Sequence, residues 1–123
     1  MRRLSIVALS LLLVSMPAVA QTATPLSKLA FDEVGQTVAT ASGATYTGLI
    51  DGSTTATPLT GIVCTATANP TGATCTSALP PLTPGTHTIT ITQTIGGASS
   101  AASAPLSFSL IVVVTPTNVR ITP

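Results

Sequence analysis

His87 is the only histidine in the chain, and together with a serine and Asp51 it could supply the general base of a nucleophilic active site. Its neighbours favour a different role. His87, Ile89 and Ile91 alternate with threonines, so on a strand they point to the buried face. Asp51 precedes Gly52, a pair that turn chemistry alone explains, and no other carboxylate is placed to orient the ring. We therefore expect a structural histidine, no catalytic residue and a protein that is not an enzyme.

The remaining charged residues are too few for charge-driven chemistry. Charged residues make up 6% of the chain, and the four basic ones are scattered from Arg2 to Arg120, so they cannot form the patch that nucleic acid requires. Asp32 and Glu33 are the only adjacent acidic pair, and neighbours on a strand point to opposite faces, where they share neither a metal ion nor a proton. We expect no nucleic-acid partner, no bound metal and no cofactor.

The first twenty residues have the layout of a secretory signal peptide. Arg2 and Arg3 precede an apolar run over Leu4–Met16, which is shorter than the roughly 20 residues that cross a bilayer. Small residues then lead to a predicted cleavage between Ala20 and Gln21. The sequence predicts export to the periplasm, the cell surface or the medium, with no membrane span after processing. The remaining residues 21–123 have the length of one domain.

Two cysteines in an exported chain favour a disulfide, with a free pair or metal ligands as the alternatives. Without supporting histidine or carboxylate ligands, Cys64 and Cys75 make a poor metal site. If Asn69 pairs with Gly72 in a hairpin, Cys64 lies opposite Ser77 and diagonally from Cys75 on the same face. A loop one residue longer puts the cysteines on opposite faces, where a bridge is strained. The disulfide therefore predicts a register in which the numbers of two paired residues add up to an odd sum, as 69 and 72 do, or else a bulge.

The pattern of the chain predicts many short strands. Threonine, valine and isoleucine are frequent, glycine and proline interrupt them at short intervals, and no apolar stripe has a helical period. Asp51-Gly52 is typical of a tight hairpin turn. An antiparallel β-sandwich of about seven strands follows. The candidate strands are Ser27–Phe31, Thr37–Ala41, Thr45–Ile50, Gly61–Ala68, Thr74–Leu79, Thr86–Thr92 and Leu106–Val114.

A specific resemblance appears in the second half of the chain. The stretches Leu82–Ile91 and Gly96–Leu106 resemble the last two strands of bacterial immunoglobulin-like repeats of secreted and surface adhesins, which are similar to fibronectin type III modules. The resemblance covers Leu79–Val114. It implies an immunoglobulin-like sandwich in which Gly85 and His87 open a strand, with the histidine capping that opening as a corner tyrosine does in related sandwiches.

The same resemblance implies a binding or spacer role outside the cytoplasm. Many such repeats carry Asp and Asn in the turn that here spans Thr94–Ala98, so calcium binding at this turn loses its oxygen ligands. We expect an exported interaction or adhesion module with a protein or glycan ligand that the sequence does not identify.

The end of the last candidate strand is apolar on both faces. Leu110 and Val112 point to one side of the strand, while Ile111 and Val113 point to the other. Such a strand is either covered by another part of the chain or offers an edge to a partner. The alternative function is therefore a structural subunit that polymerises by strand addition through Leu106–Val114, with self-association at Leu110, Ile111 and Val113.

Overall fold

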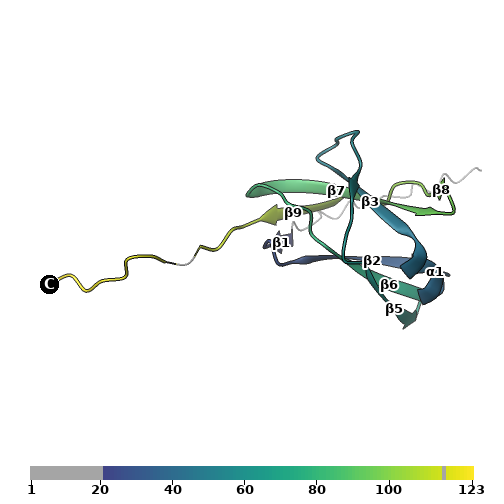
Figure 1. The fold of residues 1–123 in the computed structure, drawn as a ribbon, viewed down its shortest axis with the longest axis horizontal. Helices are drawn as coiled ribbons and strands as arrows, with labels where there is room; N and C mark the ends of the chain where they lie inside the picture. The colour runs from purple at the N-terminus through teal and green to yellow at the C-terminus, as the bar shows by residue number, and fades with distance from the viewer. Residues whose placement is uncertain (1–20, 115) are drawn as a thin grey trace, which may run out of the picture.

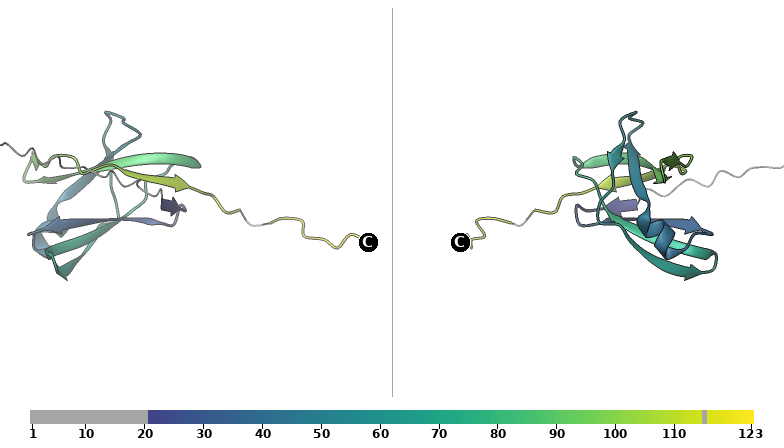
Figure 2. Two further views of the ribbon diagram at one scale, coloured as in Figure 1. Left: turned by 180° about the vertical axis from the view of Figure 1, so that it is seen from behind. Right: turned by 45° about the vertical axis from the view of Figure 1, so that its right-hand side comes forward.

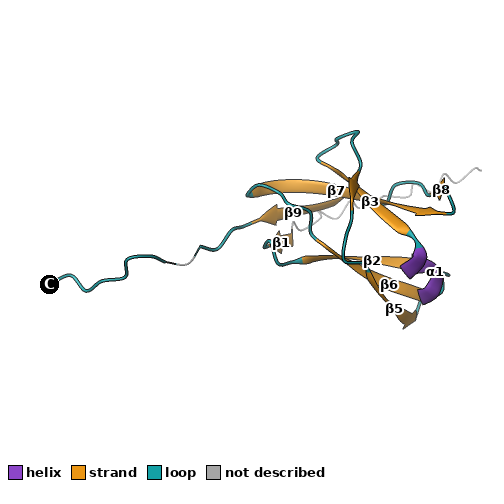
Figure 3. Cartoon of the chain, viewed as in Figure 1, coloured by secondary structure: helices purple, strands orange, loops and turns teal. Residues whose placement is uncertain are grey.

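Two β-sheets stacked face to face make up the body of the protein in a computed structural model, which describes residues 21–114 and 116–123 (Figures 1 and 3). The predicted signal peptide and Ala20 lie outside these described residues. Gln21, the predicted first residue after cleavage, begins the first strand.

The larger sheet has six strands and the smaller sheet has three. The larger one runs in the order β1 (Gln21–Ala23), β9 (Leu106–Leu110), β7 (Gly85–Ile95), β3 (Thr45–Ile50) and β4 (Thr57–Pro58), with β8 (Ala98–Ser99) paired to β7. The smaller one runs in the order β2 (Lys28–Val34), β6 (Thr71–Ala78) and β5 (Val63–Ala68). Pairing is antiparallel except between β1 and β9. The expected two-sheet architecture is present, but the larger sheet is mixed rather than purely antiparallel.

One predicted strand is wrong. Residues Thr37–Ala41 lie in a helix, α1 (Val38–Gly43), which carries the chain from the smaller sheet to the larger one. The Thr37 hydroxyl accepts a hydrogen bond from the Thr40 N–H at 3.1 Å and so caps the start of the helix. Ala41 is fully buried, and its carbonyl accepts a hydrogen bond from the Tyr46 hydroxyl at 2.9 Å. Local capping and this tertiary contact therefore override the strand preference of the segment.

The core lies between the sheets and is formed by alternate residues of the strands that face inward. Tyr46 lies at its centre, 4.8 Å from Phe31 between ring centroids, and the Gln93 side chain donates a hydrogen bond to its hydroxyl. Each buried polar group of this cluster therefore has a partner. The buried apolar residues are Leu29, Ala44, Tyr46, Leu59, Ile89, Phe108 and Leu110.

The outer face of the larger sheet carries hydroxyl groups. The predicted alternation in β7 is present, with His87 and Ile89 buried and the threonines between them on the opposite face. Neighbouring strands continue the pattern, because Thr88 pairs with Ser107 and Thr92 pairs with Thr47. This face is polar and uncharged. The threonines of β7 lie on the outer side of the sheet and leave the inward-facing positions to buried residues, so a threonine-rich sequence is compatible with a sandwich.

The disulfide between Cys64 and Cys75 is present and joins β5 to β6. The register is odd-sum, as the disulfide required, but Ala68 pairs with Thr71, so the hairpin is offset from the expected one. As a result the two cysteines are direct cross-strand partners, with Cα atoms 4.0 Å apart, rather than diagonal neighbours. Cys75 is fully buried in a small cluster with Ala41 and Ala73.

Gly72 lies where β6 passes closest to the end of β2. A Cβ at this position would lie against backbone atoms, including the Val34 Cα at 3.0 Å and the Gly35 nitrogen at 3.1 Å. These atoms cannot move without disturbing the β2–β6 pairing. We expect Gly72→Ala to lower the free energy of unfolding by about 1–3 kcal/mol, measured by urea unfolding.

A glycine in open space provides the control for this prediction. A Cβ at Gly43, in α1, would have no atom within 4 Å. We expect Gly43→Ala to leave stability unchanged or to raise it slightly. Equal unfolding midpoints for the two variants would contradict the close approach at Gly72.

Candidate functional site

The last strand is not an edge strand, so of the two alternatives for this segment the covered strand applies to Leu110, and Leu110 is not a partner edge. β9 pairs with β7 on one side and with β1 on the other, and Leu110 is only 2% exposed. The strand ends there, because β1 ends at Ala23 and offers one further hydrogen bond, from the Ile111 N–H to the Ala23 carbonyl. Ile111 and Val113 lie beyond it, 45% and 80% exposed and outside any strand.

An unpaired edge occurs instead on β2. This strand pairs with β6 along all seven of its residues and has no neighbour on its other side within the described part of the chain. Alternate backbone N–H and C=O groups of an edge strand point outward and can pair with an added strand. β1 also has a free side, but it is only three residues long.

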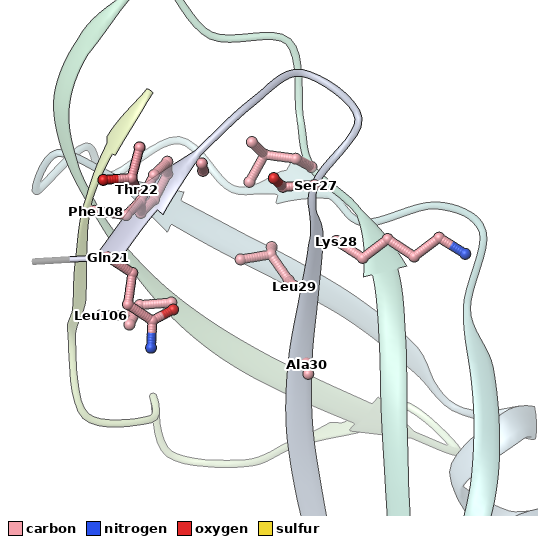
Figure 4. Close-up of a pocket in the computed structure, with 10 residues that line it drawn as sticks. Gln21, Thr22, Ser27, Lys28, Leu29, Ala30, Leu106 and Phe108 are labelled. Atoms are coloured by element: carbon pink, nitrogen blue, oxygen red, sulfur yellow. The ribbon is translucent and has the colours of Figure 1, made fainter. Parts of the chain in front are cut away.

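A cavity of about 340 Å³ lies between these two edges, where β1 faces the first half of β2 (Figure 4). Figure 4 shows Leu29 pointing from β2 toward β1, whereas Lys28 points away from the cavity. The lining combines polar and apolar residues: Gln21, Thr22, Ser27 and Lys28 with Ala23, Leu29, Ala30, Leu79, Leu106 and Phe108. Its volume is near the lower end of the range for small-molecule sites, about 300–1,000 Å³. The apolar part of this lining can take a few aliphatic side chains.

The edge strand also carries most of the charge of the domain. Of the five Lys, Arg, Asp and Glu residues after position 20, β2 holds Lys28, Asp32 and Glu33. The two carboxylates point to opposite faces, as predicted: Asp32 accepts a hydrogen bond from the Thr74 hydroxyl at 2.7 Å, and Glu33 accepts one from Gln36 at 3.1 Å. Partial burial raises the pKa of Glu33. Charged side chains on an exposed edge discourage its pairing with other chains.

His87 lies at the start of β7, where the sequence placed it, and it joins two loops. One ring nitrogen, Nδ1, lies 2.7 Å from an Asp51 carboxylate oxygen, and Nε2 lies 2.8 Å from the Thr83 carbonyl. The other Asp51 oxygen accepts the Thr88 N–H at 2.8 Å. Asp51 and Gly52 both have positive φ and form a tight turn, closed by a hydrogen bond of 2.9 Å from the Ser53 N–H to the Ile50 carbonyl. The turn is not the predicted tight hairpin, because the strand that pairs with β3 begins only at Thr57. Asp51 thus orients the histidine in addition to forming its turn, a pairing that sequence reasoning named only in the catalytic alternative that it set aside.

The His87 imidazole therefore links the Asp51 turn to the Thr83 loop through its two ring nitrogens. Both neighbouring oxygens are acceptors, so the ring binds them best when both nitrogens carry protons. The hydrogen bond to the Thr83 carbonyl, followed by the one to Asp51, raises the pKa of His87. The hydrogen bonds from His87 and then Thr88 lower the pKa of Asp51. With both nitrogens engaged, neither is free to accept a proton from a nucleophile.

The free energy of unfolding should therefore depend on pH through the His87–Asp51 pair. The raised pKa of His87 means that its contribution is complete below pH 6.5, the ordinary value, and is lost as the pH rises through the raised value. The lowered pKa of Asp51 means that its contribution is complete above pH 3.8 and is lost as the pH falls. We expect the unfolding midpoint to be highest between these values and to fall modestly above pH 6.5, because the Asp51 side chain is 49% exposed.

His87→Gln tests this assignment. The glutamine at position 87 does not ionise near neutral pH, so the unfolding midpoint of the variant should show no fall above pH 6.5. A fall of equal size in the variant would show that another group is responsible.

The described residues offer little for other chemistry. No three His, Cys, Asp or Glu side chains within residues 21–114 and 116–123 converge on a metal-binding position. No helix in the same residues is long and apolar enough to cross a membrane. Comparison with family models, curated proteins and solved structures gave no match. The candidate functional surfaces of the described residues are the edge of β2, the adjoining cavity and the segment beyond β9.

Proposed function

We propose that this protein is an exported, non-enzymatic interaction module with an immunoglobulin-like fold, and that it binds an extended protein segment along the free edge of β2. The observation that carries this proposal is the unpaired seven-residue edge beside a partly apolar cavity. An extended ligand adds a strand to such an edge: its main chain pairs with β2, and alternate side chains enter the cavity.

The strand order supports the immunoglobulin-like assignment. In that fold one sheet contains the second, fifth and fourth main strands, and the other contains the third, sixth and seventh. Here β2, β6 and β5 form the first group, and β3, β7 and β9 form the second. The contact from His87 back to the Thr83 carbonyl at the start of β7 has the position of the corner tyrosine in such sandwiches.

The cavity lies where a first strand could pair with β2. In immunoglobulin-like sheets the first strand flanks the second, but here β1 pairs with β9 instead. A ligand strand on β2 would therefore complete a four-stranded sheet. The cavity lining favours small aliphatic side chains at alternate positions of that ligand, with a basic residue able to lie near Asp32.

Peptide selection against the oxidised residues 21–123 tests the proposal. We expect peptides with alternating aliphatic residues to bind, and we expect Ala23→Leu to weaken that binding at least about tenfold because the larger side chain fills the cavity. Ala68→Leu, at an exposed position on β5, is the matched control. Peptides that bind equally well to Ala23→Leu would place the site elsewhere.

A structural subunit is the second candidate, and one observation favours it. Ile111–Val114 are four consecutive exposed apolar residues with strong strand preference. Because β9 is paired on both sides, strand addition would use these residues rather than Leu106–Leu110. Subunits that polymerise would form open chains whose length grows with concentration.

A further inference from the structure

We propose that the segment that occupies the β2 edge is Ile111–Val114 of a second copy of this chain, and that two copies exchange these segments to form a closed dimer. This inference rests on the proposed strand-acceptor role of β2 and names its occupant.

The donor segment is exposed and has no strand partner among the described residues. The exposed fractions of Ile111, Val112, Val113 and Val114 are 45%, 48%, 80% and 77%. Four β-branched residues in succession have the strongest preference for a strand. An exposed apolar group of this kind marks an interaction site.

The donor and acceptor also match in chemistry. The cavity beside β2 has an apolar part, which includes Leu29, Leu106 and Phe108, and the donor supplies aliphatic side chains on both faces. Beyond the donor the tail carries one charged residue, Arg120, which is exposed. β2 carries Lys28 as well as Asp32 and Glu33, so its net charge is −1 and opposite to that of the tail.

The path of the chain excludes docking on the same copy without a sharp reversal. β9 runs parallel to β1, and the turn at Thr24–Ser27, closed by a hydrogen bond of 2.9 Å, sends β2 back in the opposite direction. The tail leaves β9 pointing away from both sheets in the views of Figures 1 and 2. It would have to fold back directly after Leu110 to lie along its own β2.

The same path favours a closed pair over a filament. The tail leaves the molecule at the end where β2 begins, so donor and acceptor lie side by side at one end (Figure 1). A filament needs them at opposite ends, whereas two copies facing each other about a two-fold axis can exchange tails. The incoming tail then runs parallel to β2, with its valines near the cavity and the residues that follow passing the end of β2 at Val34.

Light scattering coupled to size exclusion, at two concentrations about tenfold apart, tests the exchange on the oxidised residues 21–123. We expect a monomer–dimer equilibrium in which Val113→Asp weakens the dimer at least about tenfold. Val63→Asp, at an exposed valine on the opposite edge strand β5, should leave the dimer unchanged.

Three results would overturn the exchange: a monomer at both concentrations, a dimer that Val113→Asp does not weaken, or open chains that grow with concentration. Val113 lies outside every strand, so the variant should keep the wild-type unfolding curve, which excludes misfolding as the cause. If the protein is monomeric while selected peptides still require the Ala23 cavity, the proposed function stands and only its occupant is wrong. If neither a second copy nor a selected peptide binds, both proposals fail.

Discussion

Replacing Phe108 with alanine should lower the free energy of unfolding by about 3–5 kcal/mol, the largest effect we expect from a single substitution. Phe108 is 3% exposed on β9, packs within the main core and has its ring centroid 5.9 Å from that of His87. It also lines the cavity beside β2, so its removal enlarges an existing void that the surrounding strands cannot close. Urea unfolding of the oxidised protein measures the change.

Ser109→Ala is the control for that prediction. Ser109 is the next residue on β9 and points to the outer hydroxyl face, so the substitution should change stability by no more than about 0.5 kcal/mol. A Phe108→Ala variant as stable as Ser109→Ala would mean that the core does not lie where the two sheets place it.

Removal of the disulfide should cost about 3 kcal/mol. Cys64 and Cys75 close a loop of about a dozen residues, and cross-linking a loop of that size restricts the unfolded chain by this amount. Cys75 is also buried, so a variant in which both cysteines become alanine loses part of its packing in addition. We expect the urea midpoint of that variant to fall, and the wild-type midpoint to fall comparably in reducing buffer.

The double variant also provides the control for reduction. Its unfolding curve should be the same with and without reductant, because no other cysteine is present. A wild-type protein insensitive to reductant would contradict a stabilising role for the bridge.

The local features of the fold were predictable from sequence. The alternation around His87 and Ile89 placed both residues on the buried face, because side-chain period on a strand is a property of neighbouring residues. The bounds of Thr45–Ile50 were predicted as the structure has them. The odd-sum register of the disulfide hairpin also followed from covalent geometry, although the direct pairing of the cysteines did not.

The features that sequence did not reveal are non-local. The parallel pairing of Gln21–Ala23 with the end of β9 joins opposite ends of the domain, and that pairing removes Leu110 from the edge. Because β1 pairs with β9, the outer edge of β2 has no partner. No local sequence pattern therefore marks this edge or its cavity. Helix α1 is too short for a periodic pattern and depends on the contact with Tyr46.

Asp51 likewise has one local role, in its turn, and one non-local role, in its contact with His87. Its turn-forming role is encoded by the Gly52 that follows, and this explained the residue without any partner. Its contact with His87 depends on the packing of the β3–β4 connection against the start of β7. The sequence placed Asp51 beside His87 only as part of a catalytic alternative, because turn chemistry alone explained the residue and no local pattern shows that the two side chains meet.

Amide hydrogen exchange along the two edge strands of the smaller sheet tests most directly whether β2 accepts a strand. We predict that protection of Lys28–Val34 rises when a selected peptide is added or the protein concentration is raised, while Val63–Ala68 on β5 keeps its exchange rates. Exchange along β2 that is unchanged by peptide and by concentration, or that changes equally along β5, would contradict the account.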